Sequence, residues 1–405
     1  MSEKKFPEGF YWGAATASYQ VEGGIENCDW AEAARAGRVP SCGRACEHYS
    51  RFEADFDIAK SLGHNAHRFS VEWARIEPTQ GQFNEEAIEH YRDVLRALRA
   101  RNITPFITLW HFTLPLWFSE SGGFERKDSP EIFAKYCAFV VSRLGDMCEH
   151  FSTINEPNVY ATQGWINGEW PPFKVSSKPW QRSYTGAMIK KRSKIWTLTN
   201  YFKVVKNLVK AHNLAYKLIK EILPNCHVSY VKHVHVYLKP KGFLNKIRQI
   251  LSNHFQNHSF TKRTYKYLDE IGINYYQASL YGVELTSRKT DMGWNYTPEH
   301  IYDALVMMSR YKKPLFVSEA GIADYDDSDR AEYITKQVEG VWRALKSGID
   351  VRGHMYWSLL DNYEWALGFD KRFGLVEIDY DTLERKVRPS AYVYKAICEA
   401  NAVVE

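Results

Sequence analysis

The sequence predicts an α/β fold, a (β/α)8 TIM barrel formed by a single domain over residues 1–405. Apolar, strand-like runs alternate with amphipathic helical stretches, and eight such runs can be counted along the chain. No Pro/Gly/Ser-rich linker divides them. A chain of 405 residues is long for one sandwich but ordinary for a barrel with extended loops. An open doubly wound sheet fits this pattern less well.

The predicted elements follow from periodicity and from start and stop signals. The strands are expected at 10–20, 65–73, 103–111, 151–157, 227–238, 271–281, 314–321 and 351–362. The main helices are expected at 47–62, 84–101, 129–150, 202–223, 298–311 and 328–347. Ser129 and Pro130 read as the N-cap and first residue of one helix. An aromatic-rich loop is expected over 158–200.

Composition excludes several classes of protein. Apolar residues make up 45% and charged residues 25%, which indicates a globular chain. Seven cysteines, an odd number without zinc-finger spacing, favour free thiols in a reducing compartment. The N-terminus lacks an apolar run of signal-peptide length, and no stretch approaches 18 apolar residues, so a cytoplasmic location is expected. No phosphate-binding glycine motif is present, and neither a cofactor nor a metal is expected.

Two glutamates stand at the ends of predicted strands. Glu156 follows the run Thr153-Ile154-Asn155 and precedes Pro157, which cannot continue a ladder. Glu319 ends the apolar run PLFVSE. One such glutamate alone is more often a turn or capping residue in a solvated loop. Two of them at the carboxyl ends of barrel strands fit the paired carboxylates of a glycosidase.

Other polar and aromatic side chains gather at the same strand ends. Each of them alone is more often a packing residue, but a sugar needs such a set together: amide and carboxylate partners for its hydroxyls, and an aromatic platform for its ring. An aromatic content of 15% agrees with either use. The candidates are Gln20, Arg68, His111, Asn155, Asn274, Tyr276, Trp357, Glu364 and Trp365.

Longer motifs resemble family 1 of the glycoside hydrolases, the retaining β-glycosidases. They are FYWGAATASYQVEG, HRFSVEWARI, TLWHFTLPLWF, TINEP, IGINYY, FVSEAG and DVRGHMYWSLLDNYEWALGFDKRFGLVEIDY, and together they span nearly the whole chain. GIAD after the second glutamate and RPSAYVY near the C-terminus are most similar to the short archaeal-type members.

The resemblance implies a role for each candidate. Glu156 would be the acid/base and Glu319 the nucleophile, with Asn155 holding the sugar 2-hydroxyl. Arg68 and Tyr276 would contact Glu319 and keep it ionised, and Asn274 would support the site. The wall that binds the non-reducing sugar would consist of Gln20, His111, Trp357, Glu364 and Trp365.

Three departures from the family pattern stand out. The family usually has TENG around the nucleophile, whereas this chain has SEAG at 318–321. The connection between the fifth and sixth strands, residues 239–270, is short for the family. The fifth strand carries His227, His233 and His235, for which a metal site is conceivable; no third ligand is evident, and polar lining or solvated histidines are favoured.

The expected function is exo-acting, retaining hydrolysis of small unphosphorylated β-glucosides or β-galactosides. Glu364, with Asp361 nearby, is expected to repel a sugar phosphate. A transglycosylase with the same covalent intermediate remains an alternative. A weakly active sugar- or lipid-binding barrel is another, although a pure binder does not need the two carboxylates.

Charge is unevenly distributed along the chain. Residues 174–263 hold 19 Lys and Arg against one acid, Glu221, a net charge of +18 that leaves −13 for the rest. A solvated helix face, with an internal or subunit contact to the acidic remainder, is one interpretation, so an oligomer stays open. Nucleic acid is not expected, because no reading motif accompanies the charge. The third interpretation is peripheral docking on an anionic membrane, through a lysine stripe on helix 202–223 with interfacial anchors at Trp180, Trp196, Tyr201, Phe202 and Phe243.

Overall fold

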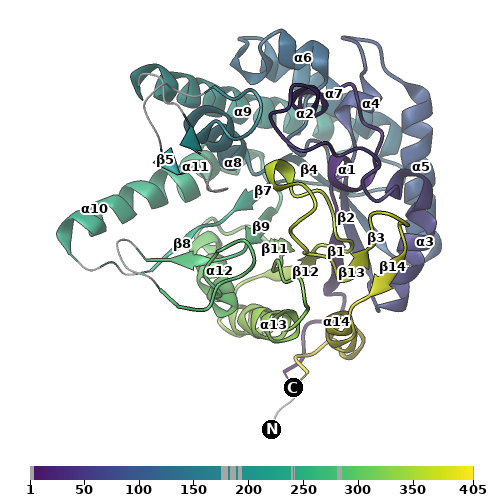
Figure 1. Ribbon diagram of the computed structural model, residues 1–405, viewed down its shortest axis with the longest axis vertical. Helices are drawn as coiled ribbons and strands as arrows, with labels where there is room; N and C mark the ends of the chain where they lie inside the picture. The colour runs from purple at the N-terminus through teal and green to yellow at the C-terminus, as the bar shows by residue number, and fades with distance from the viewer. Residues whose placement is uncertain are drawn as a thin grey trace.

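The core of the molecule is a closed barrel of eight parallel strands (Figure 1). This computed structural model describes residues 4–174, 181–182, 188–189, 194–238, 240, 242–280 and 285–404. The strand order around the barrel is β1-β12-β11-β9-β7-β4-β3-β2. The strands are β1 (Tyr11–Ala15), β2 (Ala66–Ser70), β3 (Thr104–Thr108), β4 (His150–Asn155), β7 (His227–His233), β9 (Ile271–Tyr275), β11 (Leu315–Ala320) and β12 (Val351–Trp357). Each falls on a run predicted from the sequence, so the predicted (β/α)8 fold is confirmed.

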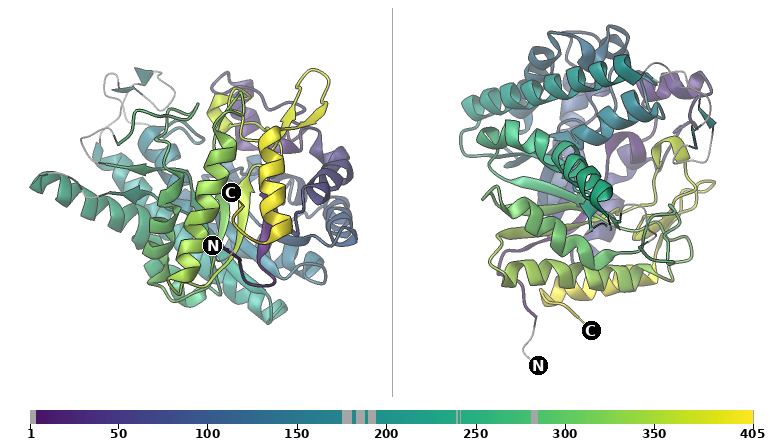
Figure 2. Two further views of the ribbon diagram at one scale, coloured as in Figure 1. Left: turned by 90° about the horizontal axis from the view of Figure 1, so that it is seen from below. Right: turned by 90° about the vertical axis from the view of Figure 1, so that its left-hand side faces the viewer.

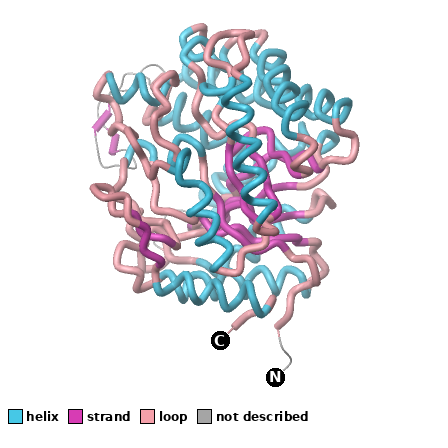
Figure 3. The backbone as a smooth tube through the Cα atoms, turned by 90° about the vertical axis from the view of Figure 1, so that its right-hand side faces the viewer, coloured by secondary structure: helices cyan, strands magenta, loops and turns pink. Residues whose placement is uncertain are grey.

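Helices cover the outside of this barrel (Figure 3). The longer ones are α3 (His48–Ser61), α5 (Glu85–Ala100), α7 (Ser129–Leu144), α9 (Lys194–Ile222), α10 (Phe243–Ser252), α12 (Ile301–Ser309), α13 (Arg330–Lys346) and α14 (Pro389–Ala400). Shorter ones are α1 (Ser18–Val21), α2 (Asp29–Arg35), α4 (Trp73–Ile76), α6 (Leu116–Glu120), α8 (Pro157–Thr162) and α11 (Ser259–Thr264). Three small two-stranded sheets pair β5 (Gln181–Arg182) with β6 (Met188–Ile189), β8 (Val236–Tyr237) with β10 (Ala278–Ser279), and β13 (Val376–Ile378) with β14 (Arg385–Val387).

Local sequence explains where the helices begin and end. The side chain of Asn84 accepts hydrogen bonds from the first turn of α5, and the apolar face of that helix, with Leu95 and Leu98, is buried. Helix α7 ends at Leu144, so its predicted extension to residue 150 is wrong. The amide of Gly145 closes the last turn on Val141, and the chain then turns into β4.

Helix α9 packs its apolar face inward, as its sequence predicts for Val204, Leu208 and Ile219, which are buried. Ile222 was expected on the same face. This prediction is wrong, because the Ile222 side chain is 43% exposed at the end of the helix. The predicted lysine stripe is also only partly solvated, since Lys220 donates to the carbonyl of Cys226 and pairs with Asp269. The expected loop over 158–200 contains α8 and the start of α9.

The connection from β7 to β9 departs most from a simple helix on the barrel wall. It contains β8, α10, the π-helical turn η3 (Asn253–His258) and α11. Helix α10 leans away from the barrel, as Figure 1 and the left panel of Figure 2 show, and none of its residues is buried. Gln249 fastens it by donating to the carbonyls of Tyr237 and Leu238 at 2.7 and 3.0 Å.

All seven cysteines are free and buried. Burial raises the pKa of the Cys148 thiol to about 12 and that of Cys226 to about 11. It raises the pKa values of Cys28, Cys46 and Cys137 well above the usual range. These thiols are therefore packing residues of the native structure.

Candidate active site

A cavity of about 340 Å³ lies at the carboxyl ends of the barrel strands, where loops vary and chemistry is placed in this fold. Nine of the predicted residues line it: Gln20, His111, Asn155, Glu156, Tyr276, Glu319, Trp357, Glu364 and Trp365. The other two, Arg68 and Asn274, are bonded to the carboxylates. The structure therefore brings the predicted set together around one cavity.

Glu156 follows the last residue of β4 and directly precedes α8, as its N-cap. Its backbone is left-handed, with φ of 43° and ψ of 60°, a conformation that costs a non-glycine residue roughly 1–2 kcal/mol. Pro157 ends the strand as predicted, and this turn directs the glutamate into the cavity. Its Oε1 accepts a hydrogen bond from Asn274 at 2.7 Å and lies 3.2 Å from Nδ1 of His233.

Glu319, in β11, is held by two donors. The guanidinium of Arg68 donates to its Oε1, and the hydroxyl of Tyr276 donates to its Oε2 at 2.7 Å. A side chain on Gly321 would place a Cβ 1.9 Å from the carbonyl oxygen of Trp357, so only glycine fits two residues after the glutamate. The SEAG segment differs from the TENG motif in its first and third residues but keeps the final glycine, for which this contact gives a steric reason.

A buried network sets the orientation of both carboxylates. Arg68 also donates to Oδ1 of Asn155 at 2.8 Å, so one guanidinium joins Glu319 to the end of β4. The hydroxyl of Ser318 donates to Oδ1 of Asn274 at 2.7 Å, which leaves the amide nitrogen to donate to Glu156. Ser318, which departs from the usual family motif, therefore orients Asn274 through its hydroxyl.

Two buried polar atoms of the wall have no partner in the described part of the chain. The amide nitrogen of Gln20 donates to Asn362 and to the carbonyl of Tyr363, which leaves its Oε1 unbonded. Asn155 lies 3.2 Å from Nε2 of His111, which leaves Nδ1 unbonded. An acceptor on Gln20 and a donor on His111 in one cavity match adjacent sugar hydroxyls.

Aromatic rings complete this end of the cavity. The imidazole of His111 is nearly parallel to the indoles of Trp357 and Trp365, with ring centroids 6.0 and 5.9 Å away. Burial, together with the charge of Arg68, lowers the pKa of His111 well below its usual value, so this ring is neutral at physiological pH. The wall thus presents apolar faces and neutral hydrogen-bonding groups, as a sugar ring requires.

Electrostatics differ between the carboxyl groups. Burial raises the pKa of Glu319, and the charge of Glu156 adds to this against the opposing effect of Arg68 and Tyr276. Burial acts on Glu156 as well, but His233, Asn274 and the charge of Lys232 outweigh it and lower its pKa. The predicted contacts of Arg68 and Tyr276 to Glu319 are present, yet their effect on its pKa is smaller than the effect of burial.

Glu364 has a raised pKa of about 8, caused by burial and by the charges of Glu319 and Glu156. It is therefore mostly a neutral hydrogen-bond donor at neutral pH. Asp361 was expected to add negative charge here, and this is wrong: it is buried and paired with Arg388 and Arg372 at 2.9 and 3.3 Å. Its role is to hold the segment after β12.

One side of the cavity carries cationic residues that were not predicted from the sequence. Lys232 is 2% exposed and lines the cavity beside His233, which contacts Glu156. Burial lowers the pKa of Lys232 to about 7. The signal was in the alternation of β7, where polar residues interrupt an apolar run. Polar lining, the favoured interpretation of the histidines, fits His233 and His235, and the described residues contain no cluster that could hold a metal ion.

Comparisons with known proteins agree with this geometry. The model of glycosyl hydrolase family 1 matches residues 2–272 and 252–403. The chain belongs to this family. The two matches meet within the connection between β7 and β9, where the sequence is short. The 405-residue chain fits a short, archaeal-type family member.

Relatives with a named activity align over nearly their whole length. The 1,4-beta-D-glucan glucohydrolase of Thermotoga neapolitana is 30% identical, with 99% of this chain and 100% of that protein covered. The beta-galactosidase of Sulfolobus acidocaldarius is 29% identical, with 99% and 96% covered.

Solved structures match as well. The beta-glycosidase from Pyrococcus horikoshii has a TM-score of 0.89 at 37% identity, covering 100% of this chain and 97% of that one. The beta-glucosidase from Thermotoga maritima in complex with glucoimidazole has a TM-score of 0.87 at 30% identity, covering 98% and 100%. The chain is therefore a glycoside hydrolase of the β-glucosidase and β-galactosidase type.

Proposed function

We propose that this protein is an exo-acting, retaining β-glycosidase that hydrolyses small unphosphorylated β-glucosides or β-galactosides. The observation that carries the proposal is the pairing of Glu156 and Glu319 in one cavity whose wall offers unpartnered atoms on Gln20 and His111. We further propose that residues 1–405 form one catalytic domain. We also propose a cytoplasmic location, which the seven free thiols support.

In the first step, the carboxylate of Glu319 attacks the anomeric carbon in its ionised form. Because burial raises the pKa of Glu319 while His233, Asn274 and Lys232 lower that of Glu156, this step requires the proton to pass to Glu156 before the attack. The bond from that carbon to the leaving oxygen breaks, and protonated Glu156 gives its proton to this oxygen. Arg68 and Tyr276 fix the nucleophile in place through their hydrogen bonds. The products of this step are a glycosyl ester on Glu319 and the free alcohol.

In the second step, Glu156 takes a proton from a water molecule, which attacks the anomeric carbon and breaks the ester. Two inversions at that carbon retain the β configuration. Asn155 is positioned by Arg68 and His111 to bind the 2-hydroxyl, where a hydrogen bond strengthens in the transition state. Asn274 orients Glu156 for both proton transfers.

Exo action is supported by the buried wall. Gln20, Trp357 and Trp365 are each at most 5% exposed, so the sugar end of the cavity offers little room for a further residue. The acid/base side is lined by Lys232, His233 and Tyr237 instead, and there the leaving group would depart.

A panel of chromogenic glycosides with NMR of the first-formed product tests this proposal. We expect turnover of β-glucosides or β-galactosides and initial release of the β anomer. Initial α anomer would exclude retention. Product in which an added alcohol replaces water at most turnovers would favour the transglycosylase, and no turnover of any glycoside would favour the sugar- or lipid-binding barrel.

A further inference from the structure

Helix α10 carries its apolar residues on the outside of the molecule. At 3.6 residues per turn, Phe243, Leu244, Ile247, Ile250 and Leu251 fall on one side of this helix. All five are exposed; Phe243 is 76% and Ile250 58% exposed. A helix that packs on a barrel buries such a face, so this orientation is the reverse of the usual one.

The polar side of α10 faces the protein. Gln249, opposite the apolar stripe, makes the two bonds to Tyr237 and Leu238 that fasten the helix. Further along, Asn253 accepts a hydrogen bond from Asn257 at 2.8 Å, and Asn257 is itself bonded to the backbone of His235. The outward direction of the apolar stripe is therefore fixed by specific bonds.

Neighbouring elements extend this apolar surface. Phe202, on α9, is 48% exposed and lies against Phe255 of η3 with ring centroids 5.9 Å apart. Tyr201 was also expected to be an interfacial anchor, and this prediction is wrong, because its side chain is buried. The side chains of Trp180 and Trp196, two further expected anchors, lie outside the described residues.

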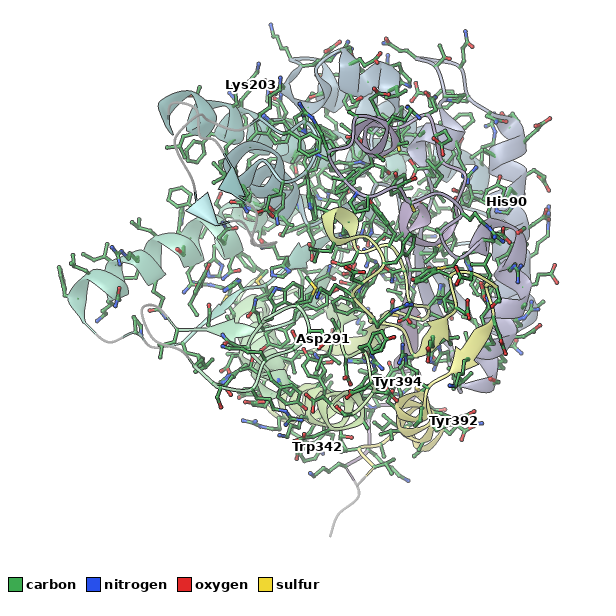
Figure 4. All side chains as sticks on the ribbon, in the orientation of Figure 1. His90, Lys203, Asp291, Trp342, Tyr392 and Tyr394 are labelled. Carbon is green, nitrogen blue, oxygen red and sulfur yellow. The ribbon has the colours of Figure 1, made fainter. Side chains whose placement is uncertain are left out.

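Basic side chains border the apolar surface. Lys246 and Arg248 flank the stripe on its two sides, and both are exposed. Further exposed basic residues on α9 and α11 are Lys203, Lys206, Lys210, Lys262 and Arg263; Figure 4 labels Lys203 on α9. An exposed apolar stripe flanked by cations is the pattern of a helix that lies in the interface of an anionic bilayer.

We propose that α10, with Phe202 and Phe255, docks this protein on an anionic lipid surface. A second copy is the less favourable occupant, because two contacts through α10 would bring together two segments of net charge +18. Nucleic acid would leave the apolar stripe without a function. No helix in the described residues is long and apolar enough to cross a membrane.

Docking places the cavity next to the lipid. Tyr237 and Gln256 both line the cavity. Gln249 of α10 donates to the carbonyl of Tyr237, and Gln256 lies in η3, directly after α10. Resting on the proposed function, the inference extends to the substrate: the favoured leaving group is a lipid or long alkyl chain that reaches Glu156 from the bilayer.

Vesicle flotation without substrate tests the docking, independently of catalysis. We expect the protein to float with phosphatidylcholine vesicles that contain phosphatidylglycerol at low salt, and less at high salt or with phosphatidylcholine alone. A triple variant, Phe243→Ser, Leu244→Ser and Ile250→Ser, should bind at least about tenfold more weakly. Reversal of Lys246 and Arg248 to Glu should weaken binding by about 25-fold or more, since each basic residue contributes about fivefold.

A matched control removes exposed apolar side chains elsewhere. Tyr392→Ser with Val306→Ser should leave flotation unchanged; Tyr392 lies on α14, away from α10 (Figure 4). All variants should keep the wild-type melting temperature, and their rates on a soluble β-glucoside should match. On an alkyl β-glucoside held in vesicles, only the α10 variants should be slower.

Three results would overturn the docking. The first is no flotation with anionic vesicles at low salt. The second is flotation that survives the triple serine variant. The third is a wild-type dimer that this variant converts to a monomer without any effect on flotation, which would assign the face to a second copy.

Discussion

Replacing Tyr276 by Phe tests how the cavity controls its nucleophile. The substitution removes the hydroxyl that donates to Oε2 of Glu319 at 2.7 Å and keeps the ring. A hydrogen bond to a charged group is worth about 1.5–3 kcal/mol. Because this bond favours the ionised form, its loss should raise the pKa of Glu319 by about 1–2 units.

The assay is the pH dependence of kcat/KM on a chromogenic β-glucoside. Only ionised Glu319 can attack, so the ascending limb should move by the same amount to higher pH. At a fixed pH below that limb, kcat/KM of the variant should be about 10- to 150-fold lower than that of the wild type, since 1.36 kcal/mol corresponds to a factor of ten.

Tyr275→Phe is the matched control. This neighbouring phenol, on the last residue of β9, is also buried, but its hydroxyl donates to the carbonyl of Thr297 at 2.6 Å and does not contact the carboxylates. Loss of stability without a shifted limb is expected for this control. A Tyr276→Phe limb that stays in place, or moves to lower pH, would refute the role given to this phenol.

Three further outcomes are expected. Glu319→Ala should be inactive, and azide should restore cleavage with an inverted product. If azide instead rescued only Glu156→Ala, Glu156 would be the nucleophile and Glu319 the acid/base. His233→Asn removes a group that lowers the pKa of Glu156, so the descending limb of kcat/KM should move to higher pH; a shift to lower pH would contradict this. A 6-phospho-β-glucoside should give a lower kcat/KM than the plain glucoside, and its disadvantage should grow as the pH rises through about 8, where Glu364 becomes ionised; a higher kcat/KM for the phosphosugar there would contradict this.

Sequence predicted the barrel because the strand signals were strong and local. The eight runs are rich in β-branched and aromatic residues, and five of them end at a Gly, Pro or polar residue, namely Gln20, His111, Pro157, Gly321 and Asn362. Helix ends were less certain. Helix α7 ends at Leu144 because the chain turns at Gly145. Ile222 is exposed because it is the last residue of α9. Neither is visible in a pattern of 3.6 residues.

The catalytic pair was predictable, but its surroundings were not. Motifs placed Glu156 and Glu319 at strand ends, and the structure brings both to one cavity. The contact between His233 and Glu156 joins residues 77 positions apart, so no local rule could find it. Likewise, Asp361 reads as an acid near the site until its partners Arg372 and Arg388 are seen.

The seven buried cysteines allow local opening of the native structure to be measured by thiol labelling. A thiol reagent reacts with the thiolate, and burial both hides these sulfurs and raises their pKa values. Cys28 precedes α2, Cys137 lies within α7, Cys226 joins α9 to β7, and Cys398 lies on α14. The order in which a reagent labels these four positions would therefore show which parts of the barrel wall open first and which open only on global unfolding.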